Sequence, residues 1–209
     1  MSRYIPNLLT VGRFFMAIGF FVVLAFYDAE EAAGWPVLDI ATVIFLVAVL
    51  TDVVDGYLAR RLDHVTAFGR IADPFVDKII ICGALAYFIG GQFVRVGEGG
   101  AAENLTGWEP WMVVVVLARE LLVTGMRSFS ESHKVPFAAT LSGKVKMFIQ
   151  CVAVTWVLVY VGHYAGDANP PTWMVVGRDI SIWAATLFTA LSGLVYIKRG
   201  YHLLRMVPG

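Results

Sequence analysis

The sequence predicts an all-α integral membrane protein of about six transmembrane helices. Of its 209 residues, 58% are hydrophobic, whereas apolar residues make up about 45–50% of an ordinary soluble domain. Apolar stretches near the length needed to span a bilayer, about 20 residues, recur along the whole chain. Lysine and arginine concentrate in alternate connections between these stretches. We expect one integral-membrane domain, residues 1–209, because no repeat, low-complexity tract or soluble linker interrupts the pattern.

The predicted spans follow the apolar stretches in chain order. The first begins behind Arg3 and lacks a small-residue cleavage site before the next apolar segment, so we interpret it as a span and not as a signal peptide. The second is followed by Arg60, and the third starts near Pro74, because proline is tolerated in the first turn of a helix. Charged residues interrupt the ends of the third and fourth. The six stretches cover residues 5–27, 37–58, 71–89, 111–126, 141–161 and 173–197.

The connections between the spans alternate in charge. Those after the odd-numbered spans are acidic or neutral, including a long segment at residues 92–110, whereas Arg3 and Arg13 lie at the N-terminal end of the first span. Because an excess of lysine and arginine marks cytoplasmic connections, we expect both termini on the cytoplasmic side, in a bacterial inner membrane. The formal net charge of zero does not indicate a nucleic-acid partner. The basic residues after the even-numbered spans are Arg60, Arg61, Arg70, Lys134, Lys144, Lys146, Lys198, Arg199 and Arg205.

Four aspartates stand where the second and third spans meet the predicted cytoplasmic surface. Asp52 and Asp55 are three residues apart and Asp73 and Asp77 four apart, so each pair lies on one face of a helix. A carboxylate inside a membrane helix costs about 2.5–3.5 kcal/mol on insertion scales, which indicates a function. Without a neighbouring histidine or cysteine cluster, these carboxylates offer an all-oxygen site suited to Mg²⁺, Mn²⁺ or Ca²⁺.

The aspartate cluster has a structural and a chemical interpretation. Individual aspartates could form ion pairs at helix ends with Arg60 or Lys78, but four carboxylates without a cation would repel one another and become protonated. Two divalent ions that clamp a phosphoryl group and its leaving oxygen promote in-line displacement at phosphorus. We therefore expect a diphosphate-containing lipid as substrate, and Gly56 and Gly69 would let it approach the backbone closely.

Eight positions of the chain match a known signature. The spacing is D-x-x-D-G-x-x-A-R-x8-G-x-x-x-D-x-x-x-D, and by these residues the chain resembles the CDP-alcohol phosphotransferases. This resemblance implies the membrane fold of that family, a homodimer, and displacement of CMP from a CDP-linked lipid, CDP-diacylglycerol, by an alcohol. The matching residues are Asp52, Asp55, Gly56, Ala59, Arg60, Gly69, Asp73 and Asp77.

The resemblance also implies a role for each signature residue. Asp52, Asp55 and Asp73 would hold two divalent cations, Mg²⁺ or Mn²⁺. Asp77 would also lie near these metals and act as the catalytic general base that takes the proton from the attacking hydroxyl, provided that it lies within hydrogen-bond reach. The residues implied to contact the CDP moiety are Asp55, Gly56, Ala59, Arg60 and Gly69.

The acceptor alcohol is indicated by segments outside the signature. "IPNLLTVGR", "ARELLVTGMRSF" and "SGKVKMFIQ" resemble the matching segments of the phosphatidylglycerophosphate-forming branch of the family, which implies sn-glycerol 3-phosphate as acceptor. A phosphorylated acceptor requires cations near the metals, and we expect these at Arg119, Arg127, Lys144 and Lys146. Arg119 and Arg127 are eight residues apart and thus nearly on one helix face. Glu120 is interpreted as orienting or neutralising Arg119.

Several alternatives remain. The chain departs from the family pattern at Thr124, Gly125, Ser128 and Met147, so a phosphatidylinositol-phosphate synthase or another CDP-alcohol phosphotransferase is the main alternative. The basic residues of the fourth and fifth spans could also be membrane anchors alone. A membrane prenyltransferase would carry two separated aspartate motifs, and a divalent-cation transporter would carry acids in the middle of several spans; the sequence has neither pattern.

Overall fold

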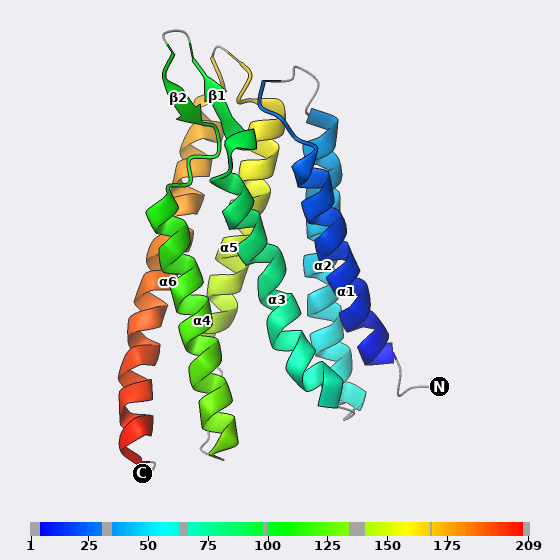
Figure 1. Ribbon diagram of the computed structural model, residues 1–209, viewed down its shortest axis with the longest axis vertical. Coiled ribbons are helices and arrows are strands. Elements are labelled where there is room, and N and C mark those ends of the chain that lie inside the picture. The colour runs from blue at the N-terminus through cyan, green and yellow to red at the C-terminus, as the bar shows by residue number, and fades with distance from the viewer. Residues whose placement is uncertain are drawn as a thin grey trace.

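The computed structural model describes residues 5–30, 35–62, 67–97, 100–133, 141–167 and 169–206. Within these ranges, the side chains of 5–10, 35, 53–62, 67–77, 131, 141–142, 144, 199 and 201–206 are outside the described part. Most of the described chain is helical (Figure 1). Its long helices are α1 (Ile5–Ala25), α2 (Trp35–Leu62), α3 (Ala67–Phe88), α4 (Pro110–Ser132), α5 (Leu141–His163) and α6 (Thr172–Met206).

Successive helices run in opposite directions along the long axis of the molecule (Figure 1). The start of α1, the ends of α2 and α4, the starts of α3 and α5 and the end of α6 therefore lie at one end, which we call the signature end. The six predicted spans are confirmed as six helices. Three helices are longer than the predicted spans: α2, α4 and α6 continue past the apolar stretches toward the signature end.

The bundle core consists of aromatic and aliphatic side chains between the helices. α1 packs against α2 and α3, α5 packs against α2 and α6, and α4 packs against α6 and α3. Phe20 of α1 lies 5.7 Å from Phe45 of α2 between ring centroids. Phe21 stacks on Tyr87 of α3 with their rings nearly parallel. Burial of such large rings is a main source of packing energy.

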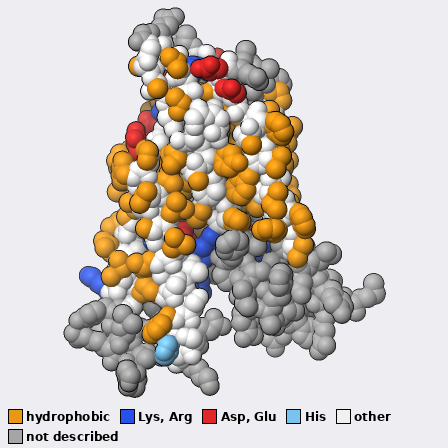
Figure 2. Space-filling view, in the orientation of Figure 1, with side chains coloured by type: hydrophobic (Ala, Val, Ile, Leu, Met, Phe, Trp, Pro, Cys, Tyr) orange, Lys and Arg blue, Asp and Glu red, His pale blue; other side chains and the backbone are white. Residues whose placement is uncertain are grey.

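The outward faces of the helices are apolar, as expected for a protein surrounded by lipid. Large exposed hydrophobic side chains include Phe15 on α1, Leu121 on α4 and Leu191 on α6. Figure 2 shows hydrophobic side chains over the middle of the visible face, with acidic residues toward the opposite end from most of the basic ones. By length and composition, Val145–His163 and Thr172–Lys198 qualify as membrane spans within the part of the chain that the structure describes.

The predicted long acidic connection at residues 92–110 folds into a small structure, which adds to the otherwise helical architecture. A 3₁₀ turn, η1 (Gly91–Phe93), leads into an antiparallel hairpin of β1 (Val94–Val96) and β2 (Ala102–Asn104). The hairpin lies at the end of the bundle remote from the signature end (Figure 1), and we call this the hairpin end. Arg95 of β1 donates to the carbonyl of Ala165, which follows α5, at 3.0 Å. The hairpin thus joins the α3–α4 and α5–α6 connections.

Candidate active site

The signature residues are distributed over the end of α2 and the start of α3. Both helices are continuous through these positions, so the helical geometry that the three- and four-residue spacings require is present. The side chain of Asp52 is described, and it is partly buried. The side chains of the other seven signature positions lie outside the described residues: Asp55, Gly56, Ala59, Arg60, Gly69, Asp73 and Asp77.

Asp52 has an ion-pair partner that the sequence did not indicate. Arg13, a buried residue in the middle of α1, donates through Nη1 to Oδ1 of Asp52. The ion-pair partners predicted from the sequence for the aspartates were Arg60 and Lys78 only. A small cavity of about 20 Å³ adjoins the Arg13–Asp52 pair, and Ile81 of α3 and Met147 of α5 form part of its wall.

A larger cavity of about 240 Å³ lies between α3, α4, α5 and α6. It shares Ile81 and Met147 with the small cavity beside Asp52, so the two are neighbours. We call it the basic cavity, because four of its lining residues are cationic and one is acidic. Its lining residues are Lys78, Ile81, Cys82, Arg119, Glu120, Val123, Thr124, Arg127, Gly143, Lys146, Met147, Gln150 and Tyr196.

Three predicted acceptor residues line this cavity. Arg119 and Lys146 are buried, whereas Arg127 is exposed. The side chain of Lys144, the fourth predicted residue, lies outside the described part of the chain. Lys78 of α3 also lines the cavity, although from the sequence it was predicted only as an ion-pair partner of an aspartate. Its position one residue after Asp77 is the signal by which it could have been found.

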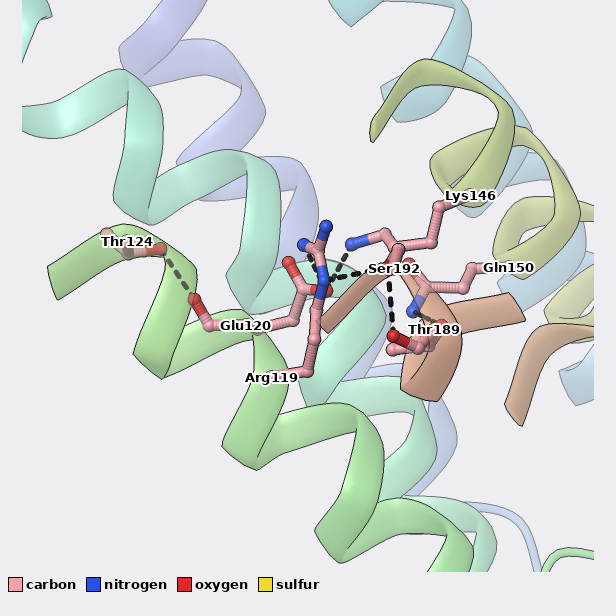
Figure 3. Close-up of polar contacts among 7 residues, drawn as sticks. All are labelled: Arg119, Glu120, Thr124, Lys146, Gln150, Thr189 and Ser192. Carbon is pink, nitrogen blue, oxygen red and sulfur yellow. Dashed lines mark hydrogen bonds and ion pairs between the residues drawn. The ribbon is translucent and has the colours of Figure 1, made fainter. Parts of the chain in front are cut away.

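Glu120 lies between two of these cations (Figure 3). Its Oε1 accepts from Arg119 Nη1 at 3.3 Å, and the same oxygen accepts from the Lys146 ammonium. All three side chains are less than a tenth exposed. Buried charges are tolerated when they are paired and hydrogen-bonded, so this carboxylate stabilises two cations that would otherwise repel each other.

α6 holds Arg119 from the other side. Arg119 Nε donates to Ser192 Oγ at 3.1 Å, and its guanidinium carbon lies 5.2 Å from the centre of the Tyr196 ring. Ser192 Oγ in turn donates to the carbonyl of Thr189 at 2.8 Å. Figure 3 shows Arg119 of α4, Lys146 of α5 and Ser192 of α6 pointing toward one another. The α6 contacts could not be predicted from the sequence, because single serines in apolar helices are common.

The chemistry of the donor set fits a divalent cation. The four aspartates of the signature supply carboxylate oxygens, which are the ligands preferred by Mg²⁺ and Mn²⁺. Asp52 and its partner Arg13 line the small cavity next to the basic cavity. Among the described side chains there is no cluster of three or more histidine, cysteine, aspartate or glutamate residues, and three of the four aspartates are not among them.

An apolar bundle with carboxylates and a basic cavity near one end is typical of a membrane-embedded enzyme that acts on a charged substrate. The family model of the CDP-alcohol phosphatidyltransferases matches residues 3–194. The chain therefore belongs to the CDP-alcohol phosphatidyltransferase family, whose members are integral membrane enzymes that use a divalent metal. The resemblance inferred from the eight signature positions is thus confirmed, and family membership favours the enzyme over the transporter and prenyltransferase alternatives.

Similar proteins match over nearly their whole length. The chain is 31% identical over 211 residues to the CDP-diacylglycerol–glycerol-3-phosphate 3-phosphatidyltransferase of Bacillus subtilis, with 96% of this chain and 97% of that protein covered. The protein of the same name from Cereibacter sphaeroides is 30% identical over 237 residues, with 98% and 99% covered. That from Rickettsia felis is 28% identical over 198 residues, with 95% and 96% covered.

Proposed function

We propose that the protein transfers the phosphatidyl group from CDP-diacylglycerol to sn-glycerol 3-phosphate, giving phosphatidylglycerophosphate and CMP. The observation that carries the acceptor assignment is the basic cavity. It adjoins the small cavity beside Asp52 and contains Arg119 and Lys146 as buried cations. Cations held in place beside a reactive centre suit a phosphorylated acceptor. The names of the full-length relatives support the same acceptor.

The signature residues are proposed to hold the donor lipid. Asp52, Asp55, Asp73 and Asp77 would bind two Mg²⁺ or Mn²⁺ ions, which when bound neutralise the diphosphate and the leaving CMP. The CDP moiety would contact Asp55 and the residues Gly56, Ala59, Arg60 and Gly69. Arg13 would keep the Asp52 carboxylate oriented, because it donates to one of the two carboxylate oxygens and leaves the other available.

The transfer itself is a displacement at phosphorus. The glycerol 3-phosphate hydroxyl attacks the phosphorus of the phosphatidyl group, its proton passes to the Asp77 carboxylate, and the bond from phosphorus to the CMP oxygen breaks. Arg119, Arg127, Lys144 and Lys146 would bind the acceptor phosphate, and Lys78 would contribute charge at the same cavity. The acyl chains of the donor would remain in the bilayer throughout.

We further propose that the protein works as a single catalytic domain, residues 1–209, in a homodimer. Its signature end would face the cytoplasm of a bacterial cell, at the inner membrane. The charge distribution of the sequence supports this orientation, because the basic connections all belong to the signature end. The cytoplasm is also the side on which a soluble phosphorylated acceptor would be supplied.

The proposed reaction is tested by measuring CMP release from CDP-diacylglycerol by the purified protein in detergent. Parallel reactions contain glycerol 3-phosphate, inositol 1-phosphate, inositol or serine, each with Mg²⁺ or Mn²⁺. We expect release with glycerol 3-phosphate alone. Release with inositol 1-phosphate instead would identify a phosphatidylinositol-phosphate synthase, and release with an unphosphorylated alcohol would contradict the role of the basic cavity.

A further inference from the structure

The basic cavity contains one acidic side chain among four cations, and that residue is buried. Glu120 is 5% exposed, and one of its carboxylate oxygens accepts from Arg119 of the same helix and from Lys146 of α5. An unpaired negative charge in a cavity that binds an anion would weaken that binding by repulsion. Its pairing with two cations indicates instead that it determines where those cations lie.

The two cations are held to different degrees. Arg119 has additional contacts with Ser192 and Tyr196 of α6, so its guanidinium is oriented from two sides. Lys146 ends in a compact ammonium on a flexible four-carbon stem, and the contact that we see for this ammonium is with Glu120. The position of the Lys146 ammonium therefore depends mainly on Glu120, whereas the position of Arg119 also depends on α6.

We infer that Glu120 is a positioning residue for the acceptor: it holds the Lys146 ammonium beside the Arg119 guanidinium, so that both cations face one acceptor phosphate. This inference rests on the proposed function, in that the acceptor is phosphorylated. Glu120 itself does not contact the reacting atoms. Without it, the two adjacent cations repel each other and the lysine stem turns away, so the phosphate loses one of its ligands although the cavity gains net positive charge.

The sign of the effect distinguishes positioning from simple neutralisation. If Glu120 only reduced the charge of the cavity, its removal would strengthen binding of the anionic acceptor. If it positions Lys146, its removal weakens that binding. We expect Glu120→Gln, which keeps the shape and removes the charge, to raise KM for glycerol 3-phosphate about tenfold or more, while KM for CDP-diacylglycerol changes by less than about twofold. Glu120→Asp keeps the charge, so KM for glycerol 3-phosphate should rise less in this variant.

The structure offers a matched control for this experiment. Asp179 on α6 pairs with the adjacent Arg178, as Glu120 pairs with the adjacent Arg119, but Asp179 is half exposed and lies toward the hairpin end. Asp179→Asn should leave both KM values unchanged. An unchanged or lower KM for glycerol 3-phosphate in Glu120→Gln would overturn the inference, and so would an equal rise in KM for CDP-diacylglycerol.

Loss of a buried charge partner can prevent folding, so a second measurement is needed. Lys146→Met combined with Glu120→Gln removes both charges of the pair. If Glu120 acts through Lys146, the double variant should have nearly the same KM for glycerol 3-phosphate as Lys146→Met alone; additive effects would overturn the inference.

CMP release by the wild-type protein with each acceptor distinguishes failure of the proposed function from failure of the inference about Glu120. Wild-type protein that uses only an unphosphorylated alcohol overturns both, whereas wild-type protein that uses glycerol 3-phosphate with no Glu120 effect overturns this inference alone.

Discussion

Arg13 gives Asp52 a cation that is present whether or not a metal is bound. It reaches Asp52 from α1, a helix outside the signature, and is itself buried. Because neighbouring carboxylates repel one another without a cation, Arg13 should limit the loss of stability when metal is removed. We predict that chelation by EDTA lowers the melting temperature of Arg13→Gln more than that of the wild-type protein, measured by thermal unfolding in detergent. An equal decrease in both proteins would contradict this.

Replacing Asp77 and replacing Asp52 should affect turnover and substrate binding differently. Asp77→Asn removes the proposed base but retains a similar shape, so CMP release should fall about 10²–10⁴-fold, while binding of CDP-diacylglycerol is largely kept. Asp52→Ala removes a proposed metal ligand and should lose metal and nucleotide binding together. Radiolabelled CDP-diacylglycerol binding, measured with Mg²⁺ beside CMP release, separates the two effects. Full turnover in either variant would refute the role assigned to that residue.

At the level of residues, the sequence predicted the cations of the basic cavity better than the ion pair of Asp52. Helical spacing placed Arg119 and Arg127 nearly on one face, and both line the cavity with Lys146. Arg13 was not predicted as the partner of Asp52, because a contact between helices depends on how each is rotated about its axis, which local spacing does not determine. Its one sequence signal is a charge within an apolar stretch, which is costly in a membrane unless it is paired.

At the level of elements, the hairpin region stabilises the end of α3. Thr106 is fully buried, and its Oγ1 lies 3.0 Å from the carbonyl oxygen of Phe88, the last residue of α3. The same hydroxyl oxygen accepts from the buried Trp108 N–H at 3.2 Å. Thr106→Val should lower the free energy of unfolding by about 1–3 kcal/mol, because this N–H loses its acceptor. Thermal unfolding measures this loss, and KM values should not change, since Thr106 is far from the signature end.

Thr42→Val is the matched control for Thr106→Val. The Thr42 hydroxyl donates to the carbonyl of Leu38 one turn earlier in α2, a carbonyl that the helix already satisfies. This substitution should therefore have little effect on the melting temperature. A similar loss in both variants would mean that the hydroxyl of Thr106 has no special role.

A close contact between α5 and α6 depends on a glycine. A Cβ atom at Gly177 would lie 2.2 Å from Trp156 Cζ2, and the Trp156 ring is held because its Nε1 donates to the carbonyl of Met174. Gly177→Ala should destabilise the protein by about 1–3 kcal/mol through overpacking. Gly19→Ala in α1, where nothing lies within 4 Å, should instead leave stability unchanged or raise it. The melting temperatures of the two variants measure this contrast.

The elements themselves were predictable to different degrees. All six helices follow from long apolar stretches, because burial in lipid requires such length. The ends were less predictable, since α2 continues to Leu62 and α6 to Met206 through polar residues that leave the apolar region. The hairpin was not predicted, because its strands of three residues are too short for an alternating pattern.

On the scale of the whole molecule, the up-and-down arrangement allows the orientation to be tested from two exposed positions. Ala101 lies in the hairpin region and His133 directly after α4, at opposite ends of the bundle. If the basic end faces the cytoplasm, a membrane-impermeant maleimide added to intact cells should label Ala101→Cys. His133→Cys should react only after permeabilisation.

The native thiols set the background of this labelling experiment. Cys82 and Cys151 both lie within helices of the bundle, Cys151 in its buried interior, so the unsubstituted protein should react weakly. Labelling of His133→Cys in intact cells, with Ala101→Cys protected, would reverse the orientation. The basic cavity includes Gly143 and Lys146 near the start of α5, at the same end of the bundle as His133. Such a reversal would therefore place the proposed acceptor site outside the cytoplasm, where a cytoplasmic phosphorylated acceptor could not reach it.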